Sequence, residues 1–458
     1  MKVLNAINNF VWGIPALILI LGIGLYIGCG TGFAQVRLFP LAFKNFCRKL
    51  KEPQTGNGSV SAYQALCTAL AATVGTGNLA GVAGAITLGG PGSIFWMWIC
   101  ALLGMGTKLA EATLAVRFSE RNELGETVGG PMYMIRKGLG RRWHWLAGIY
   151  CFFGVVAAFG VGNATQINTV IGGINSVISG YGGQTSVIIN VSIGLLLAVM
   201  VAVMFKGGAK RIGNAAERLV PFAAVFYILI CAGVLVVKWR QIPAALQAII
   251  QGAFSPRAVT GGMLGSAFTA LRVGASRGVF TNEAGMGTAS IAHAAAKVNH
   301  PVEQGMMGMI EVFLDTILIC TLTALVILSS GVPIHYGVDS GIALTSDAFA
   351  SVYGRWISIP ITLALCCFAV ATILGWGLYG ARCAQYLFGC GAWRVFACLQ
   401  VATVVFGSAL GTGVVWLLAE TVNGLMAIPN LIVLALLSPE LFRLLGEYKR
   451  SLICRSGS

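Results

Sequence analysis

Residues 71–84 read AATVGTGNLAGVAG, and this short stretch decides how the rest of the chain is interpreted. The segment that begins at Gly75 matches G-x-G-x-x-A, the phosphate-binding turn of dinucleotide enzymes. The segment from Gly77 to Gly81 matches G-x-x-x-G, a helix-packing face in membranes. Alternatively, the two glycines, two threonines and one asparagine within residues 73–78 interrupt a helix and expose its backbone. Each interpretation requires a different kind of protein around it.

The composition indicates a membrane protein. Of the 458 residues, 57% are hydrophobic and 10% are charged, whereas soluble domains carry about 25% charged residues. The dinucleotide motif also requires a preceding strand and an acidic residue about 20 positions further on. The first acidic residue after Gly75 is Glu111, so we set that interpretation aside.

Apolar stretches long enough to cross a bilayer occur about eleven times. The sequence therefore predicts an all-α polytopic membrane protein. The predicted spans are 12–30, 59–88, 91–117, 144–178, 184–205, 216–237, 259–281, 303–330, 356–380, 395–412 and 414–437. We interpret the first as a retained helix, because its amino-terminal flank holds a single lysine and no signal-peptidase site follows it.

The basic residues predict the orientation. Lysine and arginine gather in loops 31–58, 118–143 and 206–215 and in the tail 438–458, whereas the alternate loops are poor in them. The positive-inside rule then places the N-terminus outside and the C-terminus in the cytoplasm of a multi-pass cell-membrane protein. Cations confined to short loops do not form a nucleic-acid-binding face. The predicted partners are membrane lipid and a small molecule, with no obligate protein partner.

Two predicted spans contain interruptions at matching places. The span 59–88 is broken near residue 75, and the span 259–281 opens with Gly261 and Gly262 and holds three further glycines. These spans begin two five-helix halves, 59–237 and 238–437, which cross the membrane in opposite directions. An extra helix and linker, 1–58, precedes them, and a tail, 438–458, follows. Interrupted helices at corresponding positions of inverted repeats indicate the binding site of a transporter.

An unwound membrane segment is tolerated where its backbone lines a cavity or binds a ligand. Electropositive half-helix N-termini suit a carboxylate, and freed carbonyls suit sodium or an ammonium group. A zwitterionic amino acid together with a co-transported sodium ion matches both polarities. The glycines, including Gly261 and Gly262, favour a small substrate.

Three motifs resemble the alanine or glycine:cation symporter family. They are Thr73 to Val82, Gly89 to Trp98 with Gly104 beyond it, and Phe280 to Gly287. Their order agrees with that family from about residue 12 to 437. The resemblance implies sodium-coupled uptake of alanine or glycine by alternating access, on a LeuT-like five-plus-five inverted-repeat fold.

The resemblance also implies individual roles. In the V-G-x-G-N motif at residues 74–78, the amides of Thr76 and Gly77 correspond to the substrate-carboxylate contact. The implied substrate-site residues are Ala72, Thr73, Gly75, Thr76, Gly77, Asn78, Asn163 and Gln166, and the implied sodium ligands are Ala71, Val74, Ala369 and Thr372. The family more often has two adjacent hydroxyls where this chain has Ala371 and Thr372.

Three polar or aromatic residues have two interpretations each. Gln166 either contacts substrate or bonds a neighbouring helix, because a buried amide needs partners. Phe268 and Trp376 either line the cavity or only pack within the bundle.

Charged residues also lie within the predicted spans. Glu311 and Asp315 are four residues apart on one helix, Lys108 and Glu111 lie near the inner end of another, and we expect Arg272 and Arg277 in the inner half of the sixth core helix. Because intramembrane charges are costly, the hypothesis is that Arg272, Arg277, Glu311 and Asp315 contribute to a cytoplasmic gate. The alternative is a set of static ion pairs that fix helix register.

Other functions remain as alternatives. A proton path would make uptake follow the pH gradient, and broken helices also build passive channels. Residues 274–278 match G-x-S-x-G, the nucleophile-elbow pattern, but the four histidines fall in loops or at helix ends. We therefore expect no enzyme activity.

Overall fold

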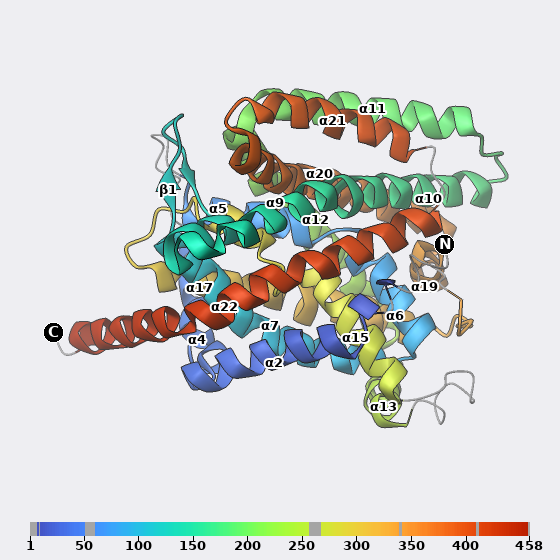
Figure 1. Ribbon diagram of the computed structural model, residues 1–458. Coiled ribbons are helices and arrows are strands. Elements are labelled where there is room, and N and C mark those ends of the chain that lie inside the picture. The colour runs from blue at the N-terminus through green and yellow to red at the C-terminus, as the bar shows by residue number, and fades with distance from the viewer. Residues whose placement is uncertain are drawn as a thin grey trace.

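The computed structural model describes residues 7–8, 10–50, 60–255, 267–338, 341–408 and 412–456. Within these ranges the chain is almost entirely helical, and its sheet is a two-stranded antiparallel hairpin. Most of the long helices run along one common direction, with the start of the chain at one end of the bundle and the C-terminus at the other (Figure 1). The predicted all-helical architecture is confirmed.

Among the described residues, seven helical segments are long and apolar enough to cross a bilayer, and a bent pair of helices makes an eighth. Three further predicted spans correspond to shorter helices. The crossing elements are α2 (Ile14–Thr31), α5 (Ala62–Thr73), η1 (Thr76–Asn78), α6 (Ala80–Gly89), α7 (Gly92–Arg117), α9 (His144–Phe159), η4 (Gly160–Ala164), α10 (Thr165–Gly180), α11 (Val187–Lys206), α12 (Gly208–Val237), α15 (Ala267–Asn282), α17 (Pro301–Val312), η6 (Phe313–Cys320), α18 (Thr321–Ser329), α20 (Ser358–Phe388), α21 (Ala392–Gly407) and α22 (Thr412–Ser456).

The shorter elements connect these helices. They are α3 (Ala34–Arg37), α4 (Phe39–Lys49), β1 (Glu120–Arg121), β2 (Thr127–Val128), α8 (Pro131–Met134), η2 (Ile135–Leu139), η3 (Arg141–Trp143), η5 (Trp239–Gln241), α13 (Ile242–Phe254), α16 (Thr288–His293), α19 (Gly341–Tyr353) and η7 (Arg355–Ile357).

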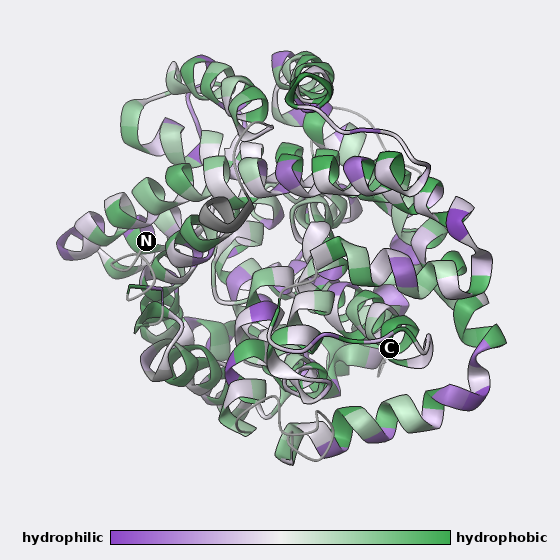
Figure 2. Cartoon of the chain, turned by 90° about the vertical axis from the view of Figure 1, so that its right-hand side faces the viewer, coloured by the Kyte–Doolittle hydropathy of each residue, from purple (hydrophilic) through white to green (hydrophobic). Residues whose placement is uncertain are grey.

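Burial distinguishes central helices from peripheral ones. Of the 18-residue apolar windows, 78% is buried in α7 but 17% in α11. The outward face of α11 carries exposed Ile188 and Leu196, and that of α12 carries Phe222. Hydrophobic residues cover much of the peripheral helices when the bundle is viewed from one end (Figure 2). These faces suit contact with lipid chains, because apolar surface gains nothing from water.

Helix α15 lies against α7 and runs parallel to it. A Cβ built on Gly274 would lie 2.4 Å from the carbonyl oxygen of Ser93, and one on Gly104 would lie 2.9 Å from the Cβ of Ala284. The two glycines of α15, Gly274 and Gly278, therefore sit inside a regular helix and allow its close approach to α7. Our expectation that they help to interrupt the span is wrong.

Two π-helices lie next to polar residues of the predicted site. The π-helix η4 comes directly before the helix that carries Gln166, and the π-helix η6 contains Asp315. Such single-turn irregularities within helices are frequent at functional sites.

The hairpin β1–β2 is fastened to the bundle by an ion pair. Arg382 of α20 donates to Glu126 at 2.7 Å. Partial burial raises the pKa of Glu126, but the hydrogen bond and positive charge of Arg382 outweigh it and leave the pKa below its usual value. This contact links the loop before α8 to the last turns of α20.

The extra N-terminal helix runs beside α22. The indole nitrogen of Trp12 donates to the carbonyl oxygen of Glu420 at 2.8 Å, and Tyr26 hydrogen-bonds Ser438 at 2.9 Å. Helix α22 has 45 residues, which at 1.5 Å per residue is about 67 Å. It therefore continues well beyond the predicted span 414–437 and includes most of the tail.

Candidate functional site

The first interruption lies where the sequence predicts it. Helix α5 ends at Thr73, Val74 and Gly75 are extended, and the chain re-enters helix through η1 and α6 at an angle of 58° to α5. A β-branched pair followed by glycine weakens the helix at this point. The last carbonyls of α5 and the first amides of η1 are thereby freed at the centre of the bundle.

Asn78 holds this unwound segment in shape. Its Oδ1 accepts a hydrogen bond from the amide of Gly75 at 2.9 Å, and its Nδ2 donates to Asp315 Oδ1 at 2.7 Å. Asp315 Oδ2 accepts from the hydroxyl of Thr316 at 2.7 Å. Asn78 is therefore a positioning residue for the loop, joined to the π-helix η6.

Three polar side-chain atoms remain without a partner around Gly75. A Cβ built on Gly75 would lie 2.6 Å from Thr372 Oγ1 and 3.5 Å from Gln166 Oε1. Within the described residues, Thr372 Oγ1, Gln166 Oε1 and Thr76 Oγ1 are buried and have no hydrogen-bond partner. Leaving such groups unpaired is costly, so the approach of Thr372 Oγ1 and Gln166 Oε1 to Gly75, next in sequence to Thr76, marks a site that a ligand could complete.

The other predicted residues of this region lie on the same two elements, the end of α5 and the middle of α20. Ala71, Val74 and Ala369 are buried, and Ala369 precedes Thr372 by about one turn of α20. Ala72 packs on Gly375, where an added Cβ would lie 2.9 Å from the Cβ of Ala72. Helix α20 thus lies directly against the end of α5.

Some predicted residues point elsewhere. The hydroxyl of Thr73 bonds back to its own helix at Ala69. Asn163 donates to the carbonyl oxygen of Gln400 at 2.8 Å, so its amide nitrogen joins η4 to α21 and not to a substrate. Phe268 is 46% exposed at the start of α15. The Thr73 hydroxyl and the Asn163 amide nitrogen are therefore already paired, whereas Asn163 Oδ1 is buried and has no partner within the described residues.

Trp376 and Gln166 both make contacts within the bundle, and Gln166 also has an unpaired atom. Trp376 is fully buried in α20 and its Cβ would meet a Cβ on Gly162 at 2.2 Å, which is close packing against η4. Gln166 combines both of its interpretations, because Nε2 donates to the carbonyl oxygen of Val161 at 3.1 Å while Oε1 stays unpaired.

A second interruption lies between α15 and α16. Gly261 and Gly262 fall outside the described residues, whereas α15 ends at Asn282 and α16 begins at Thr288. Glu283, Gly285 and Gly287, which lie between these helices, have φ values of 55°, 93° and 76°. This left-handed backbone is easy for glycine and strained for glutamate.

A buried carboxylate holds the second interruption. Glu111 Oε1 accepts from the amides of Gly285 and Gly287 at 2.9 and 3.0 Å and from Asn430 at 2.7 Å. Glu283 Oε2 accepts from Thr288 at 2.6 Å. Sequence reasoning did not assign this role, although the asparagine and two glycines of residues 282–287 repeat the composition of the first break.

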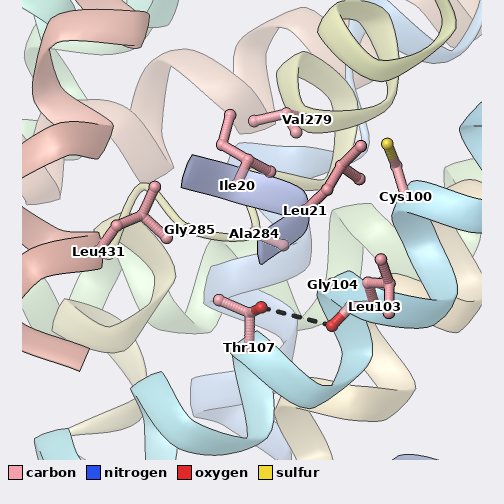
Figure 3. Close-up of a pocket in the computed structure, with 10 residues that line it drawn as sticks. All are labelled: Ile20, Leu21, Cys100, Leu103, Gly104, Thr107, Val279, Ala284, Gly285 and Leu431. Atoms are coloured by element: carbon pink, nitrogen blue, oxygen red, sulfur yellow. Dashed lines mark hydrogen bonds between the residues drawn. The ribbon is translucent and has the colours of Figure 1, made fainter. Parts of the chain in front are cut away.

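The two interruptions meet. A Cβ built on Gly77 would lie 3.0 Å from Thr281 Cγ2 and 3.6 Å from Phe280 Cδ1. A small apolar hollow of about 10 Å³ lies beside the second break, room for about one water molecule. Its lining comes from α2, α7, α15 and α22 and from Ala284 and Gly285 (Figure 3). It lies apart from the unpaired atoms near Gly75.

The intramembrane charges are paired differently from the gate hypothesis. Lys108 contacts Glu311 at 2.9 Å, and the other oxygen of Glu311 contacts His293 Nε2 at 2.9 Å. Arg277 pairs with Glu420 at 2.9 Å. The gate set of Arg272, Arg277, Glu311 and Asp315 is therefore not assembled in one place.

The position of Arg277 along the bundle follows from the packing of α15 on α7. Gly278, its neighbour, packs beside Met97 and Cys100, early in α7, whereas Ala284 lies beside Gly104 at the middle of that helix. Arg277 is therefore level with the first half of α7 and lies before the second break. Arg272, one turn before Arg277, is partly exposed.

The sequence of the chain is similar to those of known transporters. The sequence profile described as the sodium:alanine symporter family matches residues 1–456. The chain belongs to the sodium:alanine symporter family. Membership confirms the resemblance of the three motifs, and it makes the chain a multi-pass, sodium-coupled amino-acid symporter and not an enzyme.

Relatives in the sodium:alanine symporter family are similar over almost their whole length. The sodium/alanine symporter AgcS of Methanococcus maripaludis is 42% identical, over 95% of this chain and 94% of that protein. The probable sodium/glutamine symporter GlnT of Bacillus subtilis is 36% identical, over 97% of this chain and 89% of that protein.

A solved structure shows the fold. The crystal structure of MhsT in complex with L-phenylalanine matches 83% of this chain and 90% of that chain with a TM-score of 0.60, at 15% sequence identity. The predicted LeuT-like fold is confirmed. The residues 274–278 that match the nucleophile pattern lie within α15, as one part of a transporter helix.

Proposed function

We propose that this symporter carries a small neutral amino acid, alanine or glycine, into the cell together with sodium, through the site around Gly75. The N-terminus would lie outside and the C-terminus in the cytoplasm, as the loop charges predict. The observation that carries the proposal is the approach of Thr372 Oγ1 and Gln166 Oε1, two buried oxygens without partners, to the unwound backbone at Gly75.

The substrate would lie against the break between α5 and α6. In the described chain the amides of Thr76 and Gly77 have no backbone acceptor, and they lie at the electropositive start of the second half-helix, which suits a carboxylate. Gln166 Oε1 would accept from the substrate ammonium. The clash that even a methyl group on Gly75 would produce supports a small substrate.

Sodium would bind between the same break and α20. The carbonyl oxygens at the end of α5, at Ala71 and Val74, lack later helical donors. Thr372 supplies a hydroxyl oxygen that faces Gly75, and Ala369 supplies a carbonyl one turn earlier. Oxygen atoms are the ligands that hard cations prefer. Because the ion would join α5 to α20, its binding favours one arrangement of these helices.

The outer gate would be the ion pair of Arg277 and Glu420. These side chains are 11% and 18% exposed, and Arg277 lies one helical turn outward from Thr281, which contacts Gly77. Opening this pair would separate α15 from α22 and admit substrate. The pair of Lys108 and Glu311 joins two closely packed helices of one bundle and is better explained as fixing their register.

The test removes one sodium ligand. Thr372→Val keeps the shape of the side chain but removes its oxygen, so we expect sodium to be required at a concentration at least tenfold higher for half-maximal alanine uptake into proteoliposomes. Thr403→Val is the matched control, because the Thr403 hydroxyl is exposed and bonds its own helix at Leu399. If Thr372→Val requires the same sodium concentration as the unmodified protein, sodium does not bind at this site.

Competition between amino acids for uptake tests which substrate the protein carries. Unlabelled alanine and glycine are expected to block the uptake of labelled alanine, and glutamine, which the GlnT relative is named for, is expected to block it poorly. Strong inhibition by glutamine would show that the space around Gly75 is larger than proposed.

A further inference from the structure

The helix α4 lies outside the transport site and has an unusual distribution of side chains. Helix α2 ends at Thr31, and the chain turns through Gly32 and Phe33, whose φ values are 64° and 52°. Helix α4 follows after α3. It lies at the same end of the bundle as the hairpin β1–β2 and the C-terminus (Figure 1), which is the predicted cytoplasmic end.

One side of the α3–α4 segment packs on the bundle. Leu38 and Ala42 are buried, and the ring of Phe39 lies 4.9 Å from that of Phe313, centroid to centroid. Phe313 opens the π-helix η6, two residues before Asp315. The segment is therefore in direct contact with the element that holds Asn78 and the first break.

The other side mixes exposed apolar residues with cations. Val36, Phe43 and Leu50 are 62%, 44% and 49% exposed, and Lys44 is exposed among them. Residues 37–49 contain four cations, Arg37, Lys44, Arg48 and Lys49, and no acidic residue. Phenylalanine and leucine beside lysine and arginine on an amphipathic helix suit the boundary between lipid chains and headgroups.

We propose that α4 lies in the plane of the cytoplasmic leaflet and binds anionic lipid headgroups, and that this contact supports transport through Phe39 and Phe313. The occupant follows from charge complementarity, because basic segments next to a membrane helix attract anionic lipids. The exposed phenylalanine and leucine enter the leaflet between the headgroups. The side of the membrane rests on the orientation given under the proposed function.

The first experiment measures lipid binding without transport. The purified protein is equilibrated with mixed micelles of phosphatidylcholine and phosphatidylglycerol, and the phosphatidylglycerol retained per protein is determined. In the triple variant Lys44→Gln, Arg48→Gln, Lys49→Gln, the affinity for phosphatidylglycerol should fall about fivefold for each cation removed.

A matched variant removes the same charge elsewhere. The triple variant Lys206→Gln, Lys210→Gln, Arg211→Gln, at the end of α11 and the start of α12, should keep most of the retained phosphatidylglycerol. Equal losses in the two triple variants would overturn the proposal, since they would show that only net charge matters. Equal retention by the α4 triple variant and the unmodified protein would overturn it as well.

The second experiment measures the coupling to transport. Sodium-driven alanine uptake is compared in vesicles of phosphatidylcholine alone and of phosphatidylcholine with phosphatidylglycerol. The unmodified protein should be faster in the anionic vesicles, and the α4 triple variant should be equally fast in both. Phe39→Ala, which keeps the cations, should retain phosphatidylglycerol but lose its effect on uptake.

The outcomes separate this inference from the proposed function. If the unmodified protein transports equally in both vesicles, the coupling through Phe39 and Phe313 is refuted even though transport stands. If phosphatidylglycerol is retained by α4 but alanine is not taken up in any vesicle, the lipid site stands and the proposed substrate fails.

Discussion

The substitution Gly75→Ala tests the geometry of the site with a single methyl group. The added Cβ would lie 2.6 Å from Thr372 Oγ1 and 3.5 Å from Gln166 Oε1. Favourable carbon contacts begin at about 3.5 Å, so the helices must separate by about 0.9 Å or Thr372 must rotate away. Gly75 has a φ of −144°, which alanine adopts freely, so the effect comes from this clash and not from backbone strain.

The size of the effect follows from the cost of overpacking. Inserting a methyl group into a packed core costs about 1–3 kcal/mol, and 1.4 kcal/mol is a factor of ten in affinity. We therefore expect sodium and alanine to bind about 5- to 140-fold more weakly. Glycine should suffer less than alanine, because the new methyl group occupies the space of the alanine side chain.

The assay is the concentration dependence of labelled alanine and glycine uptake into proteoliposomes at several sodium concentrations. Gly81→Ala is the control in the same broken helix, since its Cβ would meet Thr281 Cγ2 at 4.0 Å, an ordinary contact. Gly75→Ala with the affinities and the alanine-to-glycine preference of the unmodified protein would refute the placement of the site.

Three further predictions concern the charges and one exposed aromatic residue. Lys108→Met leaves Glu311 buried without its cation, which should lower the free energy of unfolding by about 3–5 kcal/mol; adding Glu311→Leu should restore part of that loss in a thermal-unfolding assay. Arg277→Gln should break the pair with Glu420 and weaken the outer closure, so that a small thiol reagent added outside reacts faster with the Thr281→Cys, Arg277→Gln variant than with Thr281→Cys alone, and an unchanged rate would exclude the gate. Phe268→Ala should take up alanine at a rate within about twofold of the unmodified protein, because Phe268 is 46% exposed and substitutions at exposed positions usually have small effects. A large loss of uptake would show that Phe268 lines the substrate cavity.

The first interruption could be predicted because its cause is local. Thr73, Val74, Gly75 and Gly77 are poor helix formers in direct succession, inside a stretch that is otherwise apolar enough to cross the membrane. The same local argument gave the spans of α7 and α11 nearly to the residue. Backbone propensity decides such features with little help from tertiary packing.

The second interruption could not be placed by counting glycines. Gly274 and Gly278 are used for packing against α7, where Ser93 and Cys100 lie opposite, and glycine serves both roles in membrane helices. What distinguishes the true break is Glu111, which supplies a carboxylate to the freed amides. That partner lies on another helix, so the sequence of the span alone does not contain it.

The side-chain partners that join different helices could not be predicted from the sequence either. Asn163 and Gln166 are both polar in one apolar stretch, yet the amide nitrogen of Asn163 bonds Gln400 and only Gln166 presents an unpaired atom toward Gly75. Which face of the helix points inward depends on the preceding π-helix η4, which shifts the register of the turn.

The central claim is that one site at the first break binds the amino acid and sodium together. The most direct test measures alanine affinity with and without saturating sodium, and sodium affinity with and without saturating alanine, on the purified protein. Linkage requires the two factors to be equal, and because the ion and substrate share the segment around Gly75 we predict the same increase, about tenfold or more, in both directions. A protein in which sodium leaves alanine affinity unchanged would contradict the shared site.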